Sequence, residues 1–308
     1  MKRIRLIILL LFGFLFTVQV QAQARSYEIA NYNVLVEIQD DGSAFFTESI
    51  TYDFEGDFNG VLYDLDISGV QTPTDVAVLM QSTADGEVIP FDLSDSGASG
   101  TFTLVNTGDF LNFTVYNKMS NEKQTVIYRY RIPEIVTNYN DTAEFDRAVV
   151  GGGWKDVLND VDVTVILPTA TGDNELRTWG HGGGANSTVT IVDNQRVLLH
   201  VPQNPANQLV EAHIIFPISI TPNNFNVVNE EKYESILAQE AALAEPEREI
   251  IVINEDKHED EEILAQVTAL AEQGQKNKEL LWIVVGVLGL IASILVAIWI
   301  YRLRKRDE

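Results

Sequence analysis

The sequence predicts a mainly β protein: an antiparallel β-sandwich ectodomain of one or two lobes, followed by a helical stalk and a single transmembrane helix. Three observations predict this fold class. Between residues 25 and 221, apolar and polar side chains alternate with period two in about eleven short runs. Residues 222–279 are instead rich in Glu, Ala and Leu. Leu280–Tyr301 is an uncharged apolar run with aromatic residues at both ends, as in a membrane span.

The first 24 residues have the three regions of a secretory signal peptide. Three basic residues among the first five form the positive region, and Leu6–Val20 forms the apolar region. Ala22 and Ala24 then supply the small residues that a signal peptidase requires. An uncleaved anchor helix is the alternative, but it normally needs about 20 apolar residues. We therefore expect cleavage after Ala24.

The clearest strands form a predicted hairpin. Ala44–Phe54 alternates between a mostly apolar and a mostly polar face, and the stretch from Val34 to Ile38 does the same. Asp41-Gly42 between them is a tight-turn signal. About 200 residues are enough to bury a core without disulfides. Further strands are expected at Asp75–Gln81, Glu87–Leu93, Thr101–Asn106, Leu111–Tyr116, Gln124–Ile132, Asp160–Leu167, Ser187–Val192, Arg196–Val201 and Val210–Pro217.

The composition changes after Thr221. Asn229–Ala244 has apolar residues at helical spacing until Pro246 ends the pattern. Glu255–Glu262 is almost continuously acidic, and a second helical run, Glu261–Gln275, follows. We interpret residues 222–279 as an acidic, partly helical stalk.

The apolar run Leu280–Tyr301 is long enough to cross a membrane. At 1.5 Å per residue it spans about 33 Å, and a bilayer core is about 30 Å thick. Residues 302–308 contain four basic side chains directly after the run. The positive-inside rule therefore predicts a cytoplasmic basic tail, a single pass, and an N-terminal domain outside the cell membrane.

The charge balance excludes one class of partner. Outside the signal peptide and the tail, 43 acidic residues face 14 basic ones, a net charge of −29. A nucleic-acid-binding protein needs Lys and Arg to displace counterions from phosphate, so we expect no nucleic-acid partner. The chain has no cysteine, which excludes disulfides, thiolate nucleophiles and cysteine-ligated zinc.

Several short motifs follow one another along the strand-rich part of the sequence. They are Phe54-x-Gly56-Asp57-Phe58-x-Gly60, Tyr63-Asp64, Tyr128-x-Tyr130, Asn140-Asp141-x-Ala143-Glu144-Phe145, Gly153-Trp154, Leu167-Pro168, Trp179-Gly180-His181-Gly182 and Phe216-Pro217.

With these motifs, Tyr27–Pro217 resembles the N-terminal exported domain of the bacterial predicted-membrane-protein family known as domain of unknown function 2207. The resemblance implies a signal peptide, an exported β-sandwich and a membrane anchor, with no established activity. Members of that family commonly continue past the first span, whereas this sequence has seven residues after Tyr301.

A calcium loop is one candidate site. Asp53, Glu55 and Asp57 place carboxylates at alternate positions, with Asp64 beyond them, as a calcium loop does at its first positions. However, Phe58 stands where an EF-hand needs glycine, and Asp64 is shorter than the usual glutamate. We therefore favour a solvated acidic loop over a calcium site, and expect no other cofactor.

Two patterns raise the question of catalysis. His181-Gly182-Gly183-Gly184 matches an oxyanion-hole string of some esterases, but the G-x-S-x-G nucleophile elbow that it requires is absent from the sequence. Asp141, Glu144 and Asp146 precede Trp154, as carboxylates and an aromatic residue do in some glycosidases. Their spacing does not show that two of them face one substrate, and we expect Trp154 and Trp179 in the core. The four histidines have no zinc-ligand spacing.

These observations leave two classes of function. The first is a non-enzymatic binding or scaffolding module of the cell envelope, whose partner is another envelope protein or a wall polymer. The alternative is an envelope hydrolase that acts on a glycan or an ester through carboxylate catalysis. Because no catalytic residue pair is evident in the sequence, we favour the binding module and assign no catalytic residue.

Overall fold

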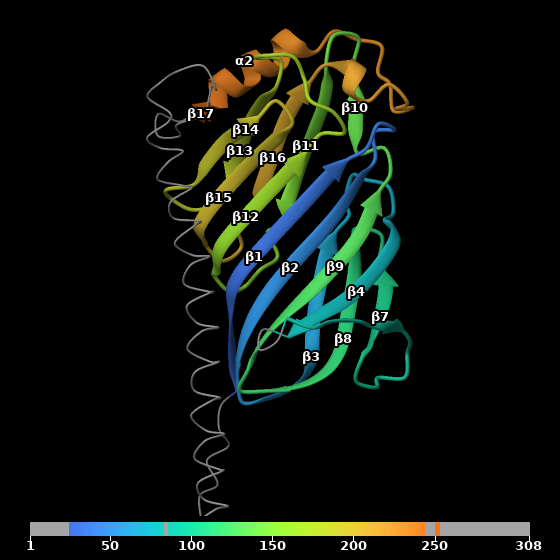
Figure 1. Ribbon diagram of the computed structural model, residues 1–308, viewed down its shortest axis with the longest axis vertical. Helices are drawn as coiled ribbons and strands as arrows, with labels where there is room; N and C mark the ends of the chain where they lie inside the picture. The colour runs from blue at the N-terminus through green and yellow to red at the C-terminus, as the bar shows by residue number, and fades with distance from the viewer. Residues whose placement is uncertain (1–24, 83–85, 244–249, 253–308) are drawn as a thin grey trace, which may run out of the picture. The chain divides into compact units, whose positions relative to one another are not determined.

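The computed structural model describes residues 25–82, 86–243 and 250–252 of the 308-residue chain. The predicted signal peptide, apolar span and basic tail, and the stalk beyond residue 243 except 250–252, lie outside these residues. In the described part, no helix combines the length and apolar character needed to cross a membrane. The predicted mainly β fold is confirmed, with mostly antiparallel sheets (Figure 1).

Nine strands form one large sheet, in the order β17-β14-β15-β12-β1-β2-β9-β4-β5. Most neighbours are antiparallel, but β1 pairs with β12, and β14 with β17, in parallel. The strands are β1 (Ser26–Ile38), β2 (Ala44–Glu55), β4 (Thr74–Ser82), β5 (Val88–Pro90), β9 (Lys123–Ile132), β12 (Leu158–Ile166), β14 (Thr188–Asp193), β15 (Arg196–Asn204) and β17 (Ile250–Val252).

Two four-stranded sheets pack against the large sheet and share its hydrophobic core. In Figure 1 the sheet that contains β11 lies behind the upper half of the large sheet, and the sheet that contains β3 lies behind the lower half. The first contains β10 (Val136–Asn138), β11 (Ala143–Val150), β16 (Val210–Phe216) and β13 (Arg177–Gly182), in that order. The second contains β3 (Asp57–Asp66), β8 (Phe110–Ser120), β7 (Thr101–Asn106) and β6 (Asp92–Leu93).

The alternating pattern of β2 explains this layering. Its even-numbered side chains from Ala44 to Phe54 are buried, because successive side chains of a strand point to opposite faces. Asp41-Gly42 forms the predicted turn, with Gly42 at φ +76°. A Cβ at Gly42 would lie 2.3 Å from the side chain of Asn224, so this turn needs glycine for its space as well as its conformation.

The predicted strands are found close to their expected positions, and five further strands are present in the described residues. Sequence reasoning missed β3, β10, β11, β13 and β17. The solvated acidic loop expected between Asp53 and Asp64 is instead mostly strand: Asp57–Asp66 forms β3, with Val61, Tyr63 and Leu65 alternating on its buried face.

The predicted helix near residue 229 is α2 (Tyr233–Leu243), preceded by the 3-10 turn η1 (Ile218–Ile220). α2 falls in the segment interpreted as the stalk, and its side chains Ile236 and Glu240 are buried. Asp141 accepts hydrogen bonds from the backbone N–H groups of Lys232 and Tyr233 and so caps the N-terminus of α2.

Candidate functional site

A carboxyl group lies in the centre of the core. Glu48 on β2 has no exposed surface. It accepts hydrogen bonds from three buried tyrosines on three different strands: Tyr32 on β1, Tyr130 on β9, and Tyr63 on β3 at 2.7 Å. Burial raises the pKa of the Glu48 carboxyl, and the three tyrosine hydrogen bonds oppose that shift without cancelling it. This cluster joins the large sheet to the sheet that contains β3.

A cleft of about 690 Å³ opens beside this cluster. Tyr63 and Tyr130 line its inner end, and its walls come mainly from β3, β11 and the Gly151–Asp156 loop. Trp154 of that loop stacks on Tyr63, with ring centroids 5.8 Å apart, and meets Tyr32 edge-on. Trp154 is half-buried: it lines the cleft and packs against the core, so the predicted core position is only partly correct.

The mouth of the cleft is lined by exposed apolar side chains and by charges of both signs. Leu62 is 73 % exposed, Tyr27 43 % and Phe110 41 %. The charged lining residues are Asp64, Asp66, Arg147, Lys155 and Asp156. Burial, together with a hydrogen bond to Asp156, raises the pKa of Tyr27. Arg147 donates to the backbone carbonyls of Asp66 and Ser68, which ties β11 to the end of β3.

A second polar cluster lies on the opposite face of β11, away from the large sheet. In the register of the small sheet, His213 on β16 lies directly between Asp146 on β11 and Trp179 on β13, and His181 lies opposite Glu211. Because side chains two residues apart share a face, Glu144 joins this surface. α2 adds the buried Glu240.

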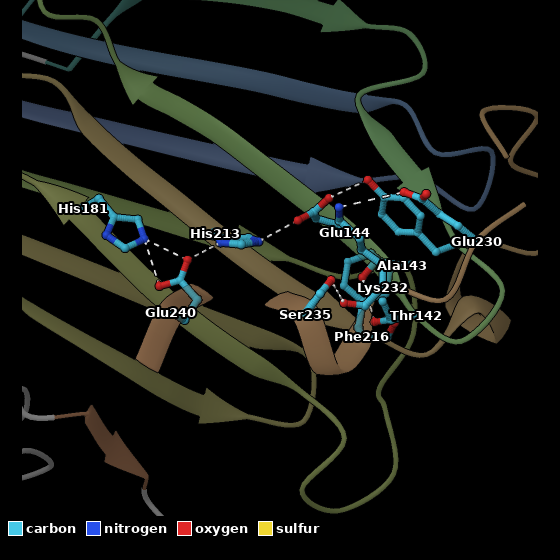
Figure 2. A network of polar contacts seen from close by, with 11 residues as sticks. Thr142, Ala143, Glu144, His181, His213, Phe216, Glu230, Lys232, Ser235 and Glu240 are labelled. Carbon is cyan, nitrogen blue, oxygen red and sulfur yellow. Dashed lines mark hydrogen bonds and ion pairs between the residues drawn. The ribbon is translucent and has the colours of Figure 1, made fainter. Parts of the chain in front are cut away.

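Figure 2 shows how His181, His213, Glu240 and Glu144 meet. Nδ1 of His213 lies 2.6 Å from Oε1 of Glu240, and its Nε2 lies 2.9 Å from Oε1 of Glu144. Nε2 of His181 lies 3.1 Å from both Glu240 oxygens. Tyr139 donates to Glu144 at 3.0 Å. We call His181, His213, Glu240, Glu144, Asp146 and Glu211 the histidine–carboxylate cluster.

Carboxylates face both ring nitrogens of His213, which affects its protonation. Burial alone would lower the pKa of His213, but hydrogen bonds with Glu144 and Glu240 raise it to about 9. Burial alone would raise the pKa of Glu144, but hydrogen bonds from His213 and Tyr139 hold it below its usual value. Burial and the charge of Asp146 raise the pKa of Glu211. The carboxylate at each ring nitrogen thus favours the doubly protonated form of His213.

The structure does not bring the four calcium candidates together. Asp53 forms an ion pair with Lys123 at 3.0 Å, and Glu55 accepts from Ser26 at 2.9 Å. Asp57 and Asp64 are seven residues apart on the extended strand β3, a separation of about 23 Å at 3.3 Å per residue. These carboxylates therefore cannot all coordinate one ion.

The other sequence candidates are separated into three places. Asp141 caps α2, Glu144 and Asp146 lie in the histidine–carboxylate cluster, and Trp154 lies at the cleft on the opposite face of β11. His181 and Gly182 end β13, so the predicted glycine-rich loop begins only at Gly183. The carboxylates and Trp154 therefore do not form one glycosidase-like site.

Sequence reasoning also missed the pairing of His181 with His213, whose rings lie 6.5 Å apart although 32 residues separate them in the chain. The sequence did contain a pattern that could have indicated the cluster. Polar or aromatic residues two positions apart share one strand face, as in Trp179-x-His181, Glu211-x-His213 and Glu144-x-Asp146. The register that aligns the three faces was not readable from the sequence.

Comparison with known proteins identifies the family of the chain. The family described as "Predicted membrane protein (DUF2207) N-terminal domain" matches residues 28–216, and the chain belongs to this family. The protein is thus a member of a membrane-protein family, and the resemblance inferred from its motifs is confirmed. No curated protein matches the chain.

Among solved structures, the chain is similar to a "putative protease" from Parabacteroides distasonis ATCC 8503, with a TM-score of 0.38, 11% identity, and coverage of 62% of this chain and 40% of that one. It is also similar to an M1 zinc metallopeptidase from Deinococcus radiodurans, with a TM-score of 0.34, 12% identity, and coverage of 63% and 43%. The chain thus aligns with about two fifths of each protein, and these scores support no functional conclusion.

Proposed function

We propose that the described β-domain is a non-enzymatic, extracytoplasmic binding module of the cell envelope, held at the membrane by Leu280–Tyr301, with the C-terminus in the cytoplasm. Its ligand occupies the cleft beside Glu48 and is a peptide-bearing glycan of the cell wall. The observation that carries this proposal is the cleft itself: about 690 Å³, within the usual range of ligand pockets, with exposed apolar side chains at its mouth.

The lining of the cleft supports this class of ligand. The apolar side chains of Leu62, Tyr27 and Phe110 offer surfaces on which the C–H face of a sugar ring can pack. Asp64 and Asp156 supply acceptors for hydroxyl and amine groups, and Lys155 supplies a cation for a peptide carboxylate. A polyanionic wall polymer fits less well, because the net charge of −29 outside the two ends of the chain would repel it.

The test uses the full-length protein in detergent. The probes are insoluble peptidoglycan, in a co-sedimentation assay, and soluble peptide-bearing glycan fragments, in calorimetric titration. We expect the double variant Leu62→Ala/Phe110→Ala to bind at least about tenfold more weakly, which corresponds to a loss of about 1.4 kcal/mol. Leu93→Ala is the matched control, because Leu93 is 67 % exposed but lies on β6 and does not line the cleft.

Three outcomes would overturn the proposal. They are the absence of binding to either probe, equal weakening by the cleft and control variants, and release of new glycan ends by the wild-type protein. The last outcome would favour the envelope hydrolase instead. Retention of peptidoglycan by the wild-type protein and by Leu93→Ala, but not by the cleft variant, would support the binding module.

A further inference from the structure

The histidine–carboxylate cluster has donor atoms and charge suited to a cation. Glu240 is buried, with its side chain 2 % exposed, and its carboxylate contacts two imidazole rings. The surface around it also carries Glu144, Asp146 and Glu211. Four carboxylates therefore surround two histidines. A divalent cation would compensate this excess of negative charge in a partly buried place, where an uncompensated charge is costly.

The geometry suits one ion between the two histidines. One ligand atom from each of His181, His213 and Glu240 lies within 4.8 Å of the others. The Glu240 carboxylate is 2.6 Å from Nδ1 of His213 and 3.1 Å from Nε2 of His181. Ligands at about 2.0–2.1 Å from a tetrahedral zinc ion are about 3.3 Å from one another, so small side-chain adjustments would close the site.

The other side of His213 has the partner expected for a metal ligand. A histidine that binds a metal through one ring nitrogen usually donates its other N–H group to a carboxylate, which fixes the ring orientation. Here Nε2 of His213 lies 2.9 Å from Glu144, and Glu144 is itself held by Tyr139 at 3.0 Å.

We propose that Nε2 of His181, Nδ1 of His213 and the Glu240 carboxylate bind a divalent transition-metal ion of the zinc type, and that Glu144 orients His213. Two imidazoles and one carboxylate form a donor set typical of zinc and leave a fourth position for water. Because the histidines lie on β16 and β13 and Glu240 lies on α2, the ion fastens α2 to the sheet.

Two other groups of side chains are rivals for the ion. Glu144, Asp146 and the Nε2 side of His213 supply only one imidazole. Asp160, Asp162 and His200 on β12 and β15 also supply one imidazole, and Nδ1 of His200 lies 2.7 Å from Asp162. One nitrogen donor with two carboxylates suits a zinc-type ion less well than two nitrogen donors do.

The experiment titrates metal-stripped, full-length protein in detergent with Co²⁺, followed by visible absorption, and then displaces Co²⁺ with Zn²⁺. His181→Gln is the main variant, because His181 is 28 % exposed and its replacement leaves the core packing in place. Glu240→Gln is the second variant. His200→Gln is the matched control for the rival cluster of Asp160, Asp162 and His200. His258→Gln is the matched control for the acidic segment Glu255–Glu262, which lies outside the described residues. Circular dichroism of each metal-free variant checks folding.

We expect one tightly bound ion per chain, with an absorption band typical of four-coordinate Co²⁺. His181→Gln and Glu240→Gln should remove it, and both control variants should keep it. Glu144→Gln should keep the band but weaken binding about 10–100-fold, as substitution of an orienting partner does. A band that survives His181→Gln, a band that is lost in His200→Gln, or the absence of stoichiometric binding would overturn the proposal. These results do not depend on whether the cleft binds glycan.

Discussion

Removal of the Tyr63 hydroxyl tests whether Glu48 holds two sheets together. The hydroxyl donates to Glu48 Oε2 at 2.7 Å, and both groups are buried. A hydrogen bond to a charged group contributes about 1.5–3 kcal/mol to stability, so Tyr63→Phe should lower the free energy of unfolding by that amount. Because 1 kcal/mol corresponds to about 2–4 °C in a domain of this size, the melting temperature should fall by about 3–12 °C.

Tyr128→Phe is the control for this substitution. Tyr128 is buried, its ring centroid lies 4.6 Å from that of Tyr63, and its hydroxyl is not one of the three that bond Glu48. The decrease in the free energy of unfolding caused by Tyr128→Phe should stay below about 1.5 kcal/mol, the upper value for an uncharged hydrogen bond. Urea unfolding of the full-length protein in a non-denaturing detergent, followed by tyrosine and tryptophan fluorescence, measures both variants. Equal losses for the two variants would refute the role assigned to Glu48.

Three further predictions concern the glycine at the end of β13, the α2 cap and pH. Gly182→Ala should lower the melting temperature more than Gly100→Ala does. Both glycines have positive φ, but a Cβ at Gly182 would lie 2.0 Å from the Leu209 carbonyl oxygen, whereas a Cβ at Gly100 would meet no atom within 4 Å. Similar melting temperatures for the two variants would contradict the steric argument. Asp141→Ala should lower the free energy of unfolding by about 0.5–2 kcal/mol and speed hydrogen exchange in α2, while Asp141→Asn should retain most of the cap. Unchanged hydrogen exchange in the alanine variant would show that Asp141 does not cap α2. Burial raises the pKa of Glu48 above its ordinary value of 4.5, so its proton stabilises the fold fully below about pH 4.5 and that contribution is lost as the pH rises through the folded-state pKa. The stability of the wild type relative to Glu48→Gln, from urea unfolding at several pH values, should therefore fall from pH 4.5 towards neutrality, and a constant difference would disprove the shift.

Local sequence patterns determined much of the fold. The hairpin of β1 and β2 follows from period-two alternation around Asp41-Gly42, because backbone geometry alone sends successive side chains to opposite faces. The same pattern already placed Glu48 on an otherwise apolar face. β3 was missed because several of its outward side chains are polar or acidic and its Gly60 interrupts the pattern, which made a half-buried strand resemble a loop.

Only the tertiary structure decided where the functional groups meet. Tyr32, Tyr63 and Tyr130 reach Glu48 from three strands. His181 on β13 and His213 on β16 both contact Glu240 on α2. Alternation within a strand predicts which face a side chain occupies, but it contains no information on the register between strands distant in sequence. That register depends on packing of the complete core, and it is what turns scattered carboxylates, tyrosines and histidines into two defined clusters.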